Sequence, residues 1–311
     1  MTSLLTNVAA RTALQTLTQT NMNLERTQSR IATGQRVATA RDNAAYWSIA
    51  TTMRSDNAAL STVEDALGLG SATIDVVYTA LSTSIQIMSN IKEKLVAARN
   101  PGVDKSKIQT EITELQAELD SVSTAAVFSG ENWLRVNSGL TSYNGTKQIV
   151  SSFSRANGII SIGTISINIE AIKLYDTGTT QVGILDGSRG TNGALSTTGT
   201  FALSTLSIAS LTDSAVDTTT LEGYIAGADR VISEMTSAAT TIGAVQSRLE
   251  LQKTFISTLM DSIEKGLGQL VDADMNEEST RLQALQVQAQ LGIQALGIAN
   301  QTSQNILALF Q

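Results

Sequence analysis

Apolar and small residues recur at alternating spacings of three and four at both ends of the chain. This pattern predicts two amphipathic helices with a period near 3.5 residues. The first row lies within residues 3–33 and consists of Ala10, Leu14, Leu17, Asn21, Leu24, Gln28 and Ile31. The second lies within residues 282–311 and consists of Leu282, Leu285, Ala289, Gly292, Leu296, Ala299, Ser303, Ile306 and Phe310. About 30 residues at about 1.5 Å each give helices of about 45 Å. Because the two are similar in length, we expect them to pair with each other.

The last helix carries a second apolar row, which consists of Val287, Leu291, Ile298 and Leu309. Residues 282–311 contain no Asp, Glu, Lys or Arg, and glutamine recurs too often for a membrane span. A surface helix of a monomer normally has one apolar stripe and an opposite face of charges. We therefore interpret this helix as a contact element of a larger assembly. Two helices of an ordinary bundle are the alternative.

Three further rows predict long helices in the interior of the chain. The first helix ends at Asn100-Pro101-Gly102, and a shorter antiparallel helix returns from that breaker. We expect a third helix, from Ile225 onward, to lie along the first. The rows consist of Leu60, Val63, Leu67, Gly70, Ile74, Val77, Leu81, Ser84, Met88, Ile91, Leu95 and Ala98, preceded by Ile49, Met53 and Asp56; of Ile108, Ile112, Leu115, Leu119, Val122 and Ala126; and of Ile225, Ala228, Ile232, Met235, Ala239, Ile242, Gln246, Leu249, Lys253, Ile256, Met260, Ile263, Leu267 and Leu270.

Residues 130–217 have a different character, rich in Gly, Thr, Ser and Asn. Isoleucines at a period near two, from Ile160 to Ile169, predict a half-buried strand pair with a hairpin around Asn157-Gly158. Residues 176–200 are nearly of low complexity, and we expect them to form exposed loops too polar for a core.

Two short segments separate the terminal helices from the long ones, and we interpret them as joints. The first contains Arg36, Arg41 and Asp42, and Asp42 is expected to cap the next helix. The second begins at Gly266 and Gly268 and includes the two carboxylates of Asp272 and Asp274.

The predicted fold is mainly α, with long antiparallel helical rods and a small β-rich outer region inserted in the middle. The rods are a terminal coiled-coil pair and a helical bundle. Three domains are expected: 1–42 with 268–311, 43–130 with 218–267, and 131–217.

Composition narrows the classes of function. The formal charge of −7 and the pI of about 4.8 make nucleic acid and anionic membranes poor partners. The chain has no histidine and no cysteine, which removes the usual general base, thiol nucleophiles and structural zinc ligands. Asp272 and Asp274 lack a third ligand nearby, so helix capping is favoured over metal binding or acid-base catalysis. We expect no enzyme and no cofactor. The first residues lack a basic segment followed by an apolar core, so we expect no cleavable secretory signal.

Several motifs in one order resemble those of the bacterial flagellins, and most those of alphaproteobacterial members. They are Arg30-Ile31-Ala32-Thr33-Gly34-Gln35-Arg36-Val37, Ala40-Arg41-Asp42-Asn43-Ala44-Ala45, Val127-Phe128-Ser129-Gly130, Ile242-Gly243-Ala244-Val245-Gln246-Ser247-Arg248-Leu249, Asp272-Ala273-Asp274, Ala299-Asn300-Gln301 and Asn305-Ile306-Leu307-Ala308-Leu309. The resemblance implies a structural subunit of the helical flagellar filament, which is extracellular and serves swimming motility.

The same resemblance implies the partners. It implies a homopolymer, with sister flagellins as further subunits, an export chaperone and the type III apparatus, and the filament cap and hook-associated proteins. The expected subunit-interface residues are Leu14, Leu17, Leu24, Ile31, Leu285, Leu291, Leu296, Ile298, Ile306, Leu309 and Phe310, and the joint residues are Arg36, Arg41, Asp42, Asp272 and Asp274. A hook-filament junction protein and a secreted coiled-coil effector or adhesin remain the alternatives. No glycan acceptor is assigned among the serines and threonines of the middle region.

Overall fold

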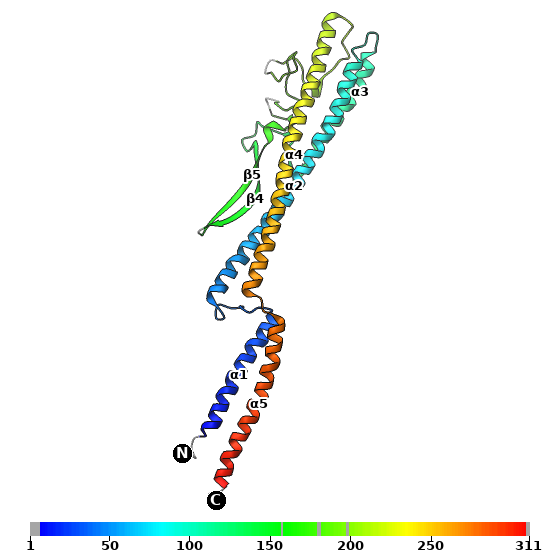
Figure 1. The fold of residues 1–311 in the computed structure, drawn as a ribbon. Coiled ribbons are helices and arrows are strands. Elements are labelled where there is room, and N and C mark those ends of the chain that lie inside the picture. The colour runs from blue at the N-terminus through cyan, green and yellow to red at the C-terminus, as the bar shows by residue number, and fades with distance from the viewer. Residues whose placement is uncertain (1–6, 157, 179–181, 197–198, 309–311) are drawn as a thin grey trace. The chain divides into compact units, whose positions relative to one another are not determined.

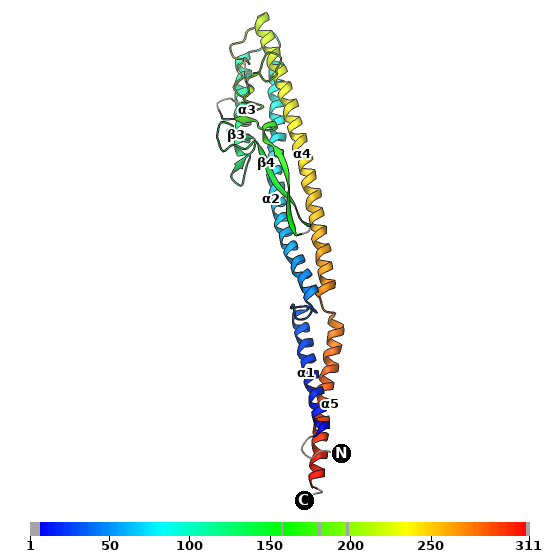
Figure 2. The same cartoon turned by 90° about the vertical axis from the view of Figure 1, so that its left-hand side faces the viewer.

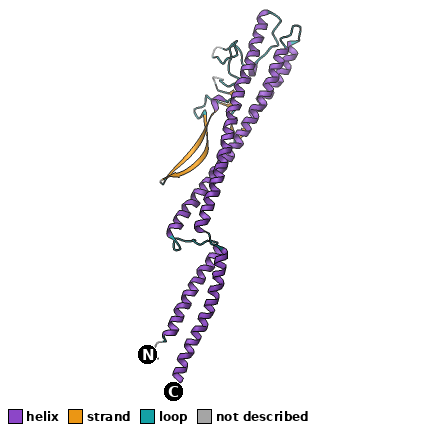
Figure 3. Cartoon of the chain, viewed as in Figure 1, coloured by secondary structure: helices purple, strands orange, loops and turns teal. Residues whose placement is uncertain are grey.

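The computed structural model describes residues 7–156, 158–178, 182–196 and 199–308, with side chains as far as residue 301. The chain divides into two compact units, Met1–Ala58 with Leu259–Gln311 and Ala59–Thr258. Long helices dominate both, and strands occur in the second alone among the described residues (Figures 1 and 3). The mainly α fold with a strand-rich middle is thus confirmed. The helices are α1 Val8–Thr33, α2 Ala44–Ala97, α3 Lys105–Ala125, α4 Ala215–Val271 and α5 Met275–Ala308. The division into three domains stays a prediction.

In the first unit, α1 and α5 pack side by side and run antiparallel, so that their free ends lie together (Figures 1 and 2). Helix α1 begins at Asn7, whose side-chain oxygen accepts a hydrogen bond from the backbone N–H of Ala10 at 3.0 Å. It ends at Gly34, which has a φ of 69°. This left-handed conformation is one that glycine adopts without a steric penalty, and it stops the helix.

The long predicted row of α2 is confirmed in the second unit. All twelve members from Leu60 to Ala98 are buried, so one helical face follows the 3.5-residue period over about ten turns. The backward extension through Ile49 is wrong by one residue. Ala50 is buried and Ile49 is 48% exposed. At this end of α2 the inward row therefore passes through Ala50 and the half-buried Met53.

Helix α4 is longer than predicted at both ends. It begins at Ala215, ten residues before Ile225, because Ser214 accepts a hydrogen bond from the backbone N–H of Asp217 at 3.2 Å and so caps the first turn. A run of threonines in that turn hides the helix from a search for apolar periods. At the other end α4 continues through Gly266 and Gly268 to Val271, so the prediction that these glycines belong to the joint is wrong.

The predicted hairpin is confirmed, and Gly158, which leads into its second strand, has a φ of 78°. Strand β4 (Thr146–Ala156) pairs antiparallel with β5 (Ile159–Asn168), and a bulge lies between Val150 and Ser152. Ile165, Ile167 and Ile169 are buried, whereas Ile160 and Ile162 are 55% and 62% exposed. The bulge lies on β4, so the alternation along β5 is unbroken: the buried isoleucines occupy odd positions, and Ile160 and Ile162 occupy even positions on the opposite face of the strand.

Shorter strands surround the hairpin. Strands β1 (Val127–Phe128) and β2 (Glu131–Asn132) are antiparallel, and β3 (Arg135–Val136) pairs parallel with β6 (Tyr175–Asp176).

The hairpin packs on α2 at a glycine. A Cβ atom built on Gly70 would lie 2.5 Å from Cγ2 and 2.9 Å from Cδ1 of Ile149 in β4. A close approach therefore exists at Gly70, and its partner is a strand. Gly70 leaves the space into which the side chain of Ile149 packs.

The prediction that residues 176–200 are exposed loops is wrong for much of the segment that the structure describes. Ile184, Leu185 and Arg189 are buried, and the chain continues into the buried residues Leu203, Leu206 and Ile208. Glutamines of α3 hold this part of the chain: Gln116 Nε2 donates to the carbonyl oxygen of Leu203 at 2.8 Å, and Gln109 Oε1 accepts from the N–H of Ile208 at 2.7 Å. These side-chain hydrogen bonds pair backbone groups of Leu203 and Ile208, so this stretch can be buried although the composition of the region suggests solvent exposure.

Arg189 connects this segment to α4. Its guanidinium is wholly buried and donates from Nη2 to Glu234 Oε2 at 2.7 Å and to the carbonyl oxygen of Ile184 at 2.7 Å. Nη1 donates to the carbonyl oxygen of Gly193 at 2.8 Å. The loop therefore depends on a buried charge whose counter-ion, Glu234, belongs to the rod.

A second buried pair lies beside β6. Lys173 Nζ donates to Asp176 Oδ2 at 2.8 Å, and Asp176 also accepts from the backbone and hydroxyl of Ser138. Burial alone would raise the pKa of Asp176, but the hydrogen bonds from Lys173 and Ser138 outweigh it and hold that pKa well below its usual value. Asp176 is thus charged at neutral pH and holds the parallel strand pair in place.

The first prediction concerns Gly70. Replacing Gly70 with Ala should lower the free energy of unfolding of the second unit by about 1 kcal/mol, since displacing Ile149 costs more than the gain in helix propensity. Gly68 lies two residues away on α2 with nothing within 4 Å of an added Cβ, so Gly68→Ala should raise the same quantity by up to about 1 kcal/mol. Urea unfolding monitored by circular dichroism measures both. Equal effects of the two substitutions would contradict the proposed packing.

The second prediction concerns Glu234. Glu234→Gln leaves the buried guanidinium of Arg189 without its counter-ion and should cost about 2 kcal/mol of stability. The matched control is Glu222→Gln, which breaks the exposed pair with Arg99 and should cost less than about 1 kcal/mol. In a Trp47→Phe background the fluorescence of Trp133, which is 5% exposed, reports unfolding of the second unit. A loss for Glu234→Gln no larger than the control's would show that the ion pair does not hold the loop.

Candidate functional site

The contact between α1 and α5 uses the row predicted for the last helix. Its members as far as residue 301, which are Leu282, Leu285, Ala289, Gly292, Leu296 and Ala299, are all buried or half-buried. Three of these six are small, and a Cβ added to Gly292 would lie 3.2 Å from Cδ1 of Leu17. The two helices therefore approach closely, as the glycine in that row indicates.

The row predicted for α1 is partly wrong. Leu14, Asn21 and Gln28 are exposed, and the inward positions between Leu17 and Ile31 are Thr20, Leu24 and Thr27. The hydroxyl of Thr20 donates to the carbonyl oxygen of Thr16 at 3.0 Å, so it can be buried without an unsatisfied donor. A search for apolar residues therefore selected Leu14, which is exposed, and missed Thr20 and Thr27, which are polar but buried.

The predicted interface residues thus fall into two sets. Leu17, Leu24, Ile31, Leu285 and Leu296 lie on the inward faces and contribute to the pair within the chain. Leu14, Leu291 and Ile298 lie on the outward faces and are 54%, 57% and 67% exposed. The side chain of Ile306 and the residues Leu309 and Phe310 lie outside the described part. Contact of any of these residues with another copy stays a prediction.

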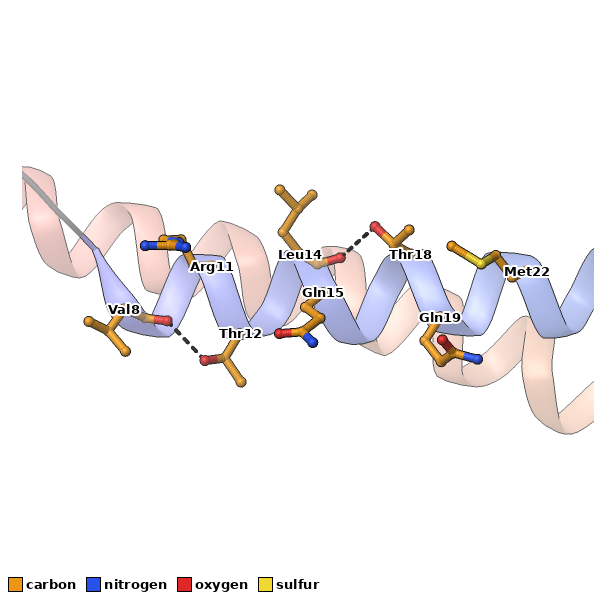
Figure 4. A pocket seen from close by; sticks show the side chains of 8 residues that line it. All are labelled: Val8, Arg11, Thr12, Leu14, Gln15, Thr18, Gln19 and Met22. Carbon is orange, nitrogen blue, oxygen red and sulfur yellow. Dashed lines mark hydrogen bonds between the residues drawn. The ribbon is translucent and has the colours of Figure 1, made fainter.

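The outward face of α1 forms a shallow groove of about 640 Å³ (Figure 4). Its lining comes from α1 alone and alternates apolar with polar side chains, among them Val8, Leu14 and Met22. Thr12 and Thr18 donate their hydroxyls to the carbonyl oxygens of Val8 and Leu14, which leaves their methyl groups free for contact. The groove contains one charged residue, Arg11. Such a surface suits another uncharged helix.

Four apolar side chains of α5 are exposed over about three turns. Val287, Leu291, Ile293 and Ile298 are between 54% and 67% exposed. Ile293 was not singled out by the sequence, because it falls between the two rows. Val287, Leu291 and Ile298 lie on one face and form an apolar surface of the kind that soluble proteins cover in an assembly, whereas Ile293 lies about 140° around the helix from Ile298.

The joint is held by backbone hydrogen bonds between its two segments. The N–H of Arg36 donates to the carbonyl oxygen of Val271 at 2.6 Å, and the N–H of Ala273 donates to that of Gly34 at 2.9 Å. The guanidinium of Arg36 donates to the carbonyl oxygen of Leu270 at 3.1 Å, one of the unpaired carbonyls at the end of α4. Arg36 and Arg41 are both exposed, and their role as joint residues stays a prediction.

The carboxylates of the joint differ in their roles. Asp274 accepts from the N–H groups of Asn276 and Glu277, at 2.9 and 3.3 Å, and so caps α5 as the sequence indicates. The expectation that Asp42 caps α2 is wrong, because Asn43 accepts from the N–H groups at the start of that helix. Asp42 instead accepts from Thr39, whose backbone N–H lowers the pKa of this exposed carboxyl. Asp272 lies next to Gly268, with Oδ2 2.8 Å from the position of an added Cβ.

The described side chains include no group of three carboxylates that could hold a metal ion. No helix in the described ranges is long and apolar enough to cross a membrane.

The third prediction compares two glycines of α5. Gly297→Ala, with nothing within 4 Å of the added Cβ, should stabilise the helix by about 1 kcal/mol and slow amide exchange in α5 about fivefold. Gly292→Ala should not slow amide exchange, because the methyl group of the new alanine pushes α5 away from Leu17. Hydrogen exchange of the solitary subunit, read by mass spectrometry, tests the difference. Equal slowing by both substitutions would show that the helices do not pack closely at Gly292.

Comparison with known proteins agrees with this arrangement. Residues 4–138 match the family model of the bacterial flagellin N-terminal helical region, and residues 225–310 match that of the C-terminal helical region. Similar proteins include Flagellin C of Rhizobium meliloti (strain 1021), 52% identical, and Flagellin A of the same strain, 40% identical. The flagellin of Brucella melitensis biotype 1 (strain ATCC 23456 / CCUG 17765 / NCTC 10094 / 16M) is 41% identical. Each alignment covers 100% of both chains. These similarities favour the filament subunit over the junction protein and the effector or adhesin. The chain belongs to the bacterial flagellins, the structural proteins that polymerise into the extracellular flagellar filament.

Proposed function

We propose that this flagellin polymerises through the outward faces of α1 and α5, with Leu14, Leu291 and Ile298 as contacts to other copies. The observation that supports the proposal is the exposure of these side chains, 54%, 57% and 67%, on helices whose inward faces are already occupied. Each Leu or Ile that is fully buried on assembly contributes about 1.5–3 kcal/mol. The joint residues Arg36, Asp272 and Asp274 hold the two segments from which these faces extend.

The terminal pair is the weaker part of the solitary subunit. On the described part of α1 only Thr20 and Thr27 are buried, and on that of α5 only Glu278 and Leu285. By contrast, α2 buries a continuous row of large apolar residues. A pair that buries so little recovers little of its ordering entropy, so neighbouring copies would complete its folding. A head-to-tail contact that does not close then extends into an open helical fibre.

The proposed role as a filament subunit also implies the remaining partners. It includes sister flagellins in one filament, an export chaperone, the type III apparatus, and the cap and hook-associated proteins. Export without a cleaved signal and the lack of enzymatic activity belong to this proposal too. What supports them is membership of the family, together with a sequence that has neither histidine nor cysteine.

The fourth prediction tests the outward face of α5. The double substitution Leu291→Ser and Ile298→Ser should raise the critical concentration for polymerisation at least about a hundredfold, since two interface side chains lose their apolar contact. Thermal unfolding of the solitary subunit should stay unchanged, because both residues are exposed there.

The control is Leu140→Ser, at a loop residue that is also 57% exposed and belongs to the predicted outer region. It should polymerise like the wild type. Sedimentation of seeded samples and electron micrographs measure the fraction of polymer. Normal filaments from the double variant at the wild-type critical concentration would contradict the proposed contact.

A further inference from the structure

The apolar residues between α1 and α5 do not by themselves select one alignment of the two helices. Leu17 packs against Gly292, and Leu24 lies one heptad further along α1. A slide of α1 by seven residues would therefore place another leucine against the same glycine. Ala and Thr occupy about half of the other inward positions, and such small residues discriminate weakly between alignments.

One pair of charged side chains interrupts this repeat. Glu278, in the first turn of α5, is 4% exposed, and its Oε1 accepts from Arg30 Nη1 in the last turn of α1 at 2.9 Å. Arg281, on the same helix as Glu278, donates to the same oxygen at 3.0 Å. Arg30 and Glu278 are the charged residues among the inward side chains that the structure describes; the other charges on these helices are exposed.

The pair is not optimised for stability. Glu278 Oε2 and Arg30 Nε are buried without a hydrogen bond to any described group. A buried ion pair with unsatisfied atoms contributes little net stability, but removing one partner is costly because the other charge stays buried. A slide by one heptad would do this, since it would put Val37 or Asn23 in the place of Arg30.

We propose that Arg30 and Glu278 are positioning residues that fix the register of α1 against α5. The outward rows of the two helices then present one defined combined surface to neighbouring copies. This last consequence rests on the proposed function. The register itself is measured in the solitary subunit, so either claim can fail without the other.

The joint is the competing explanation for a fixed register. Its hydrogen bonds, from Arg36 to Val271 and from Ala273 to Gly34, also restrict sliding. They involve backbone atoms and persist in side-chain variants at 30 and 278. A register that survives those variants would therefore be set by the joint.

Engineered cysteines can read the register because the chain has none of its own. A Cβ on Gly292 lies 3.7 Å from that of Leu17, within the range of about 3.5–4.5 Å that disulfides require. The pair Leu17→Cys with Gly292→Cys reports the observed register. The pairs Leu24→Cys with Gly292→Cys and Ala10→Cys with Gly292→Cys report slides of one heptad in either direction. Each pair is oxidised in dilute monomer, and disulfide yield is compared within one cysteine background.

Four backgrounds are compared with the wild type. Arg30→Leu with Glu278→Leu replaces both charges by apolar groups and leaves Arg281 its surface partner Glu277, at 2.8 Å. In this background disulfide yield from the slipped pairs should rise at least about tenfold. Glu278→Gln, which keeps the size of the side chain, should raise it as well. Arg30→Lys preserves the cation and should keep the wild-type pattern, as should the control Glu277→Gln at the neighbouring exposed carboxylate.

Circular dichroism of every variant tests whether the helices are retained. If the double leucine variant loses them, the disulfide yields of Glu278→Gln are compared with those of the wild type instead. Unchanged yields from the slipped pairs in both Glu278 variants would overturn the proposal and assign the register to the joint. An equal rise in the Glu277→Gln control would overturn it too, because the effect would then not depend on the buried carboxylate.

Discussion

The close approach of α1 and α5 determines how the first unit can be used. Gly292 against Leu17 allows the two helices to approach closely at this point, and leucines such as Leu285 and Leu296 contribute to the contact elsewhere. That contact leaves Leu291 and Ile298 on the opposite face, where they are 57% and 67% exposed. An apolar surface on both sides of a thin helix pair is stable in water only when copies of the chain surround it. The proposed polymer contacts thus use the faces that the packing of the pair leaves exposed.

The second unit is built on the opposite principle. The buried row of α2 contains large side chains such as Leu67, Ile74 and Met88, which bury enough area for a stable scaffold without a partner. The hairpin and the loop around Arg189 then attach to these helices through specific contacts, Ile149 at Gly70 and the guanidinium at Glu234. A unit with its own core can fold before assembly. In the proposed function, the terminal pair gains its remaining contacts from neighbouring copies during assembly.

Much of this could be predicted from the sequence, because long helices repeat one signal many times. Twelve positions of α2 follow a single period, and one misplaced residue such as Ile49 does not alter the conclusion. The hairpin was recognisable from its isoleucines and from the Asn-Gly turn. The inward row of α5 was predicted in full as far as side chains are described, since glycine and alanine are the residues that close helix packing requires.

Several of the errors share one physical cause, which is that polar residues were assumed to face water. Thr20 and Thr27 are buried between helices, Arg189 is buried under a loop, and the threonines after Ser214 form a helical turn. In each case a hydrogen bond that depends on geometry can offset the cost of burial, as the hydroxyl of Thr20 shows, and composition carries no record of that geometry. Glu278 is another polar residue that is buried. In the proposed role its carboxylate distinguishes one register of α1 against α5, which apolar side chains repeated every seven residues cannot do. The residues that sequence patterns place least well are therefore those that distinguish one packing arrangement from its near neighbours.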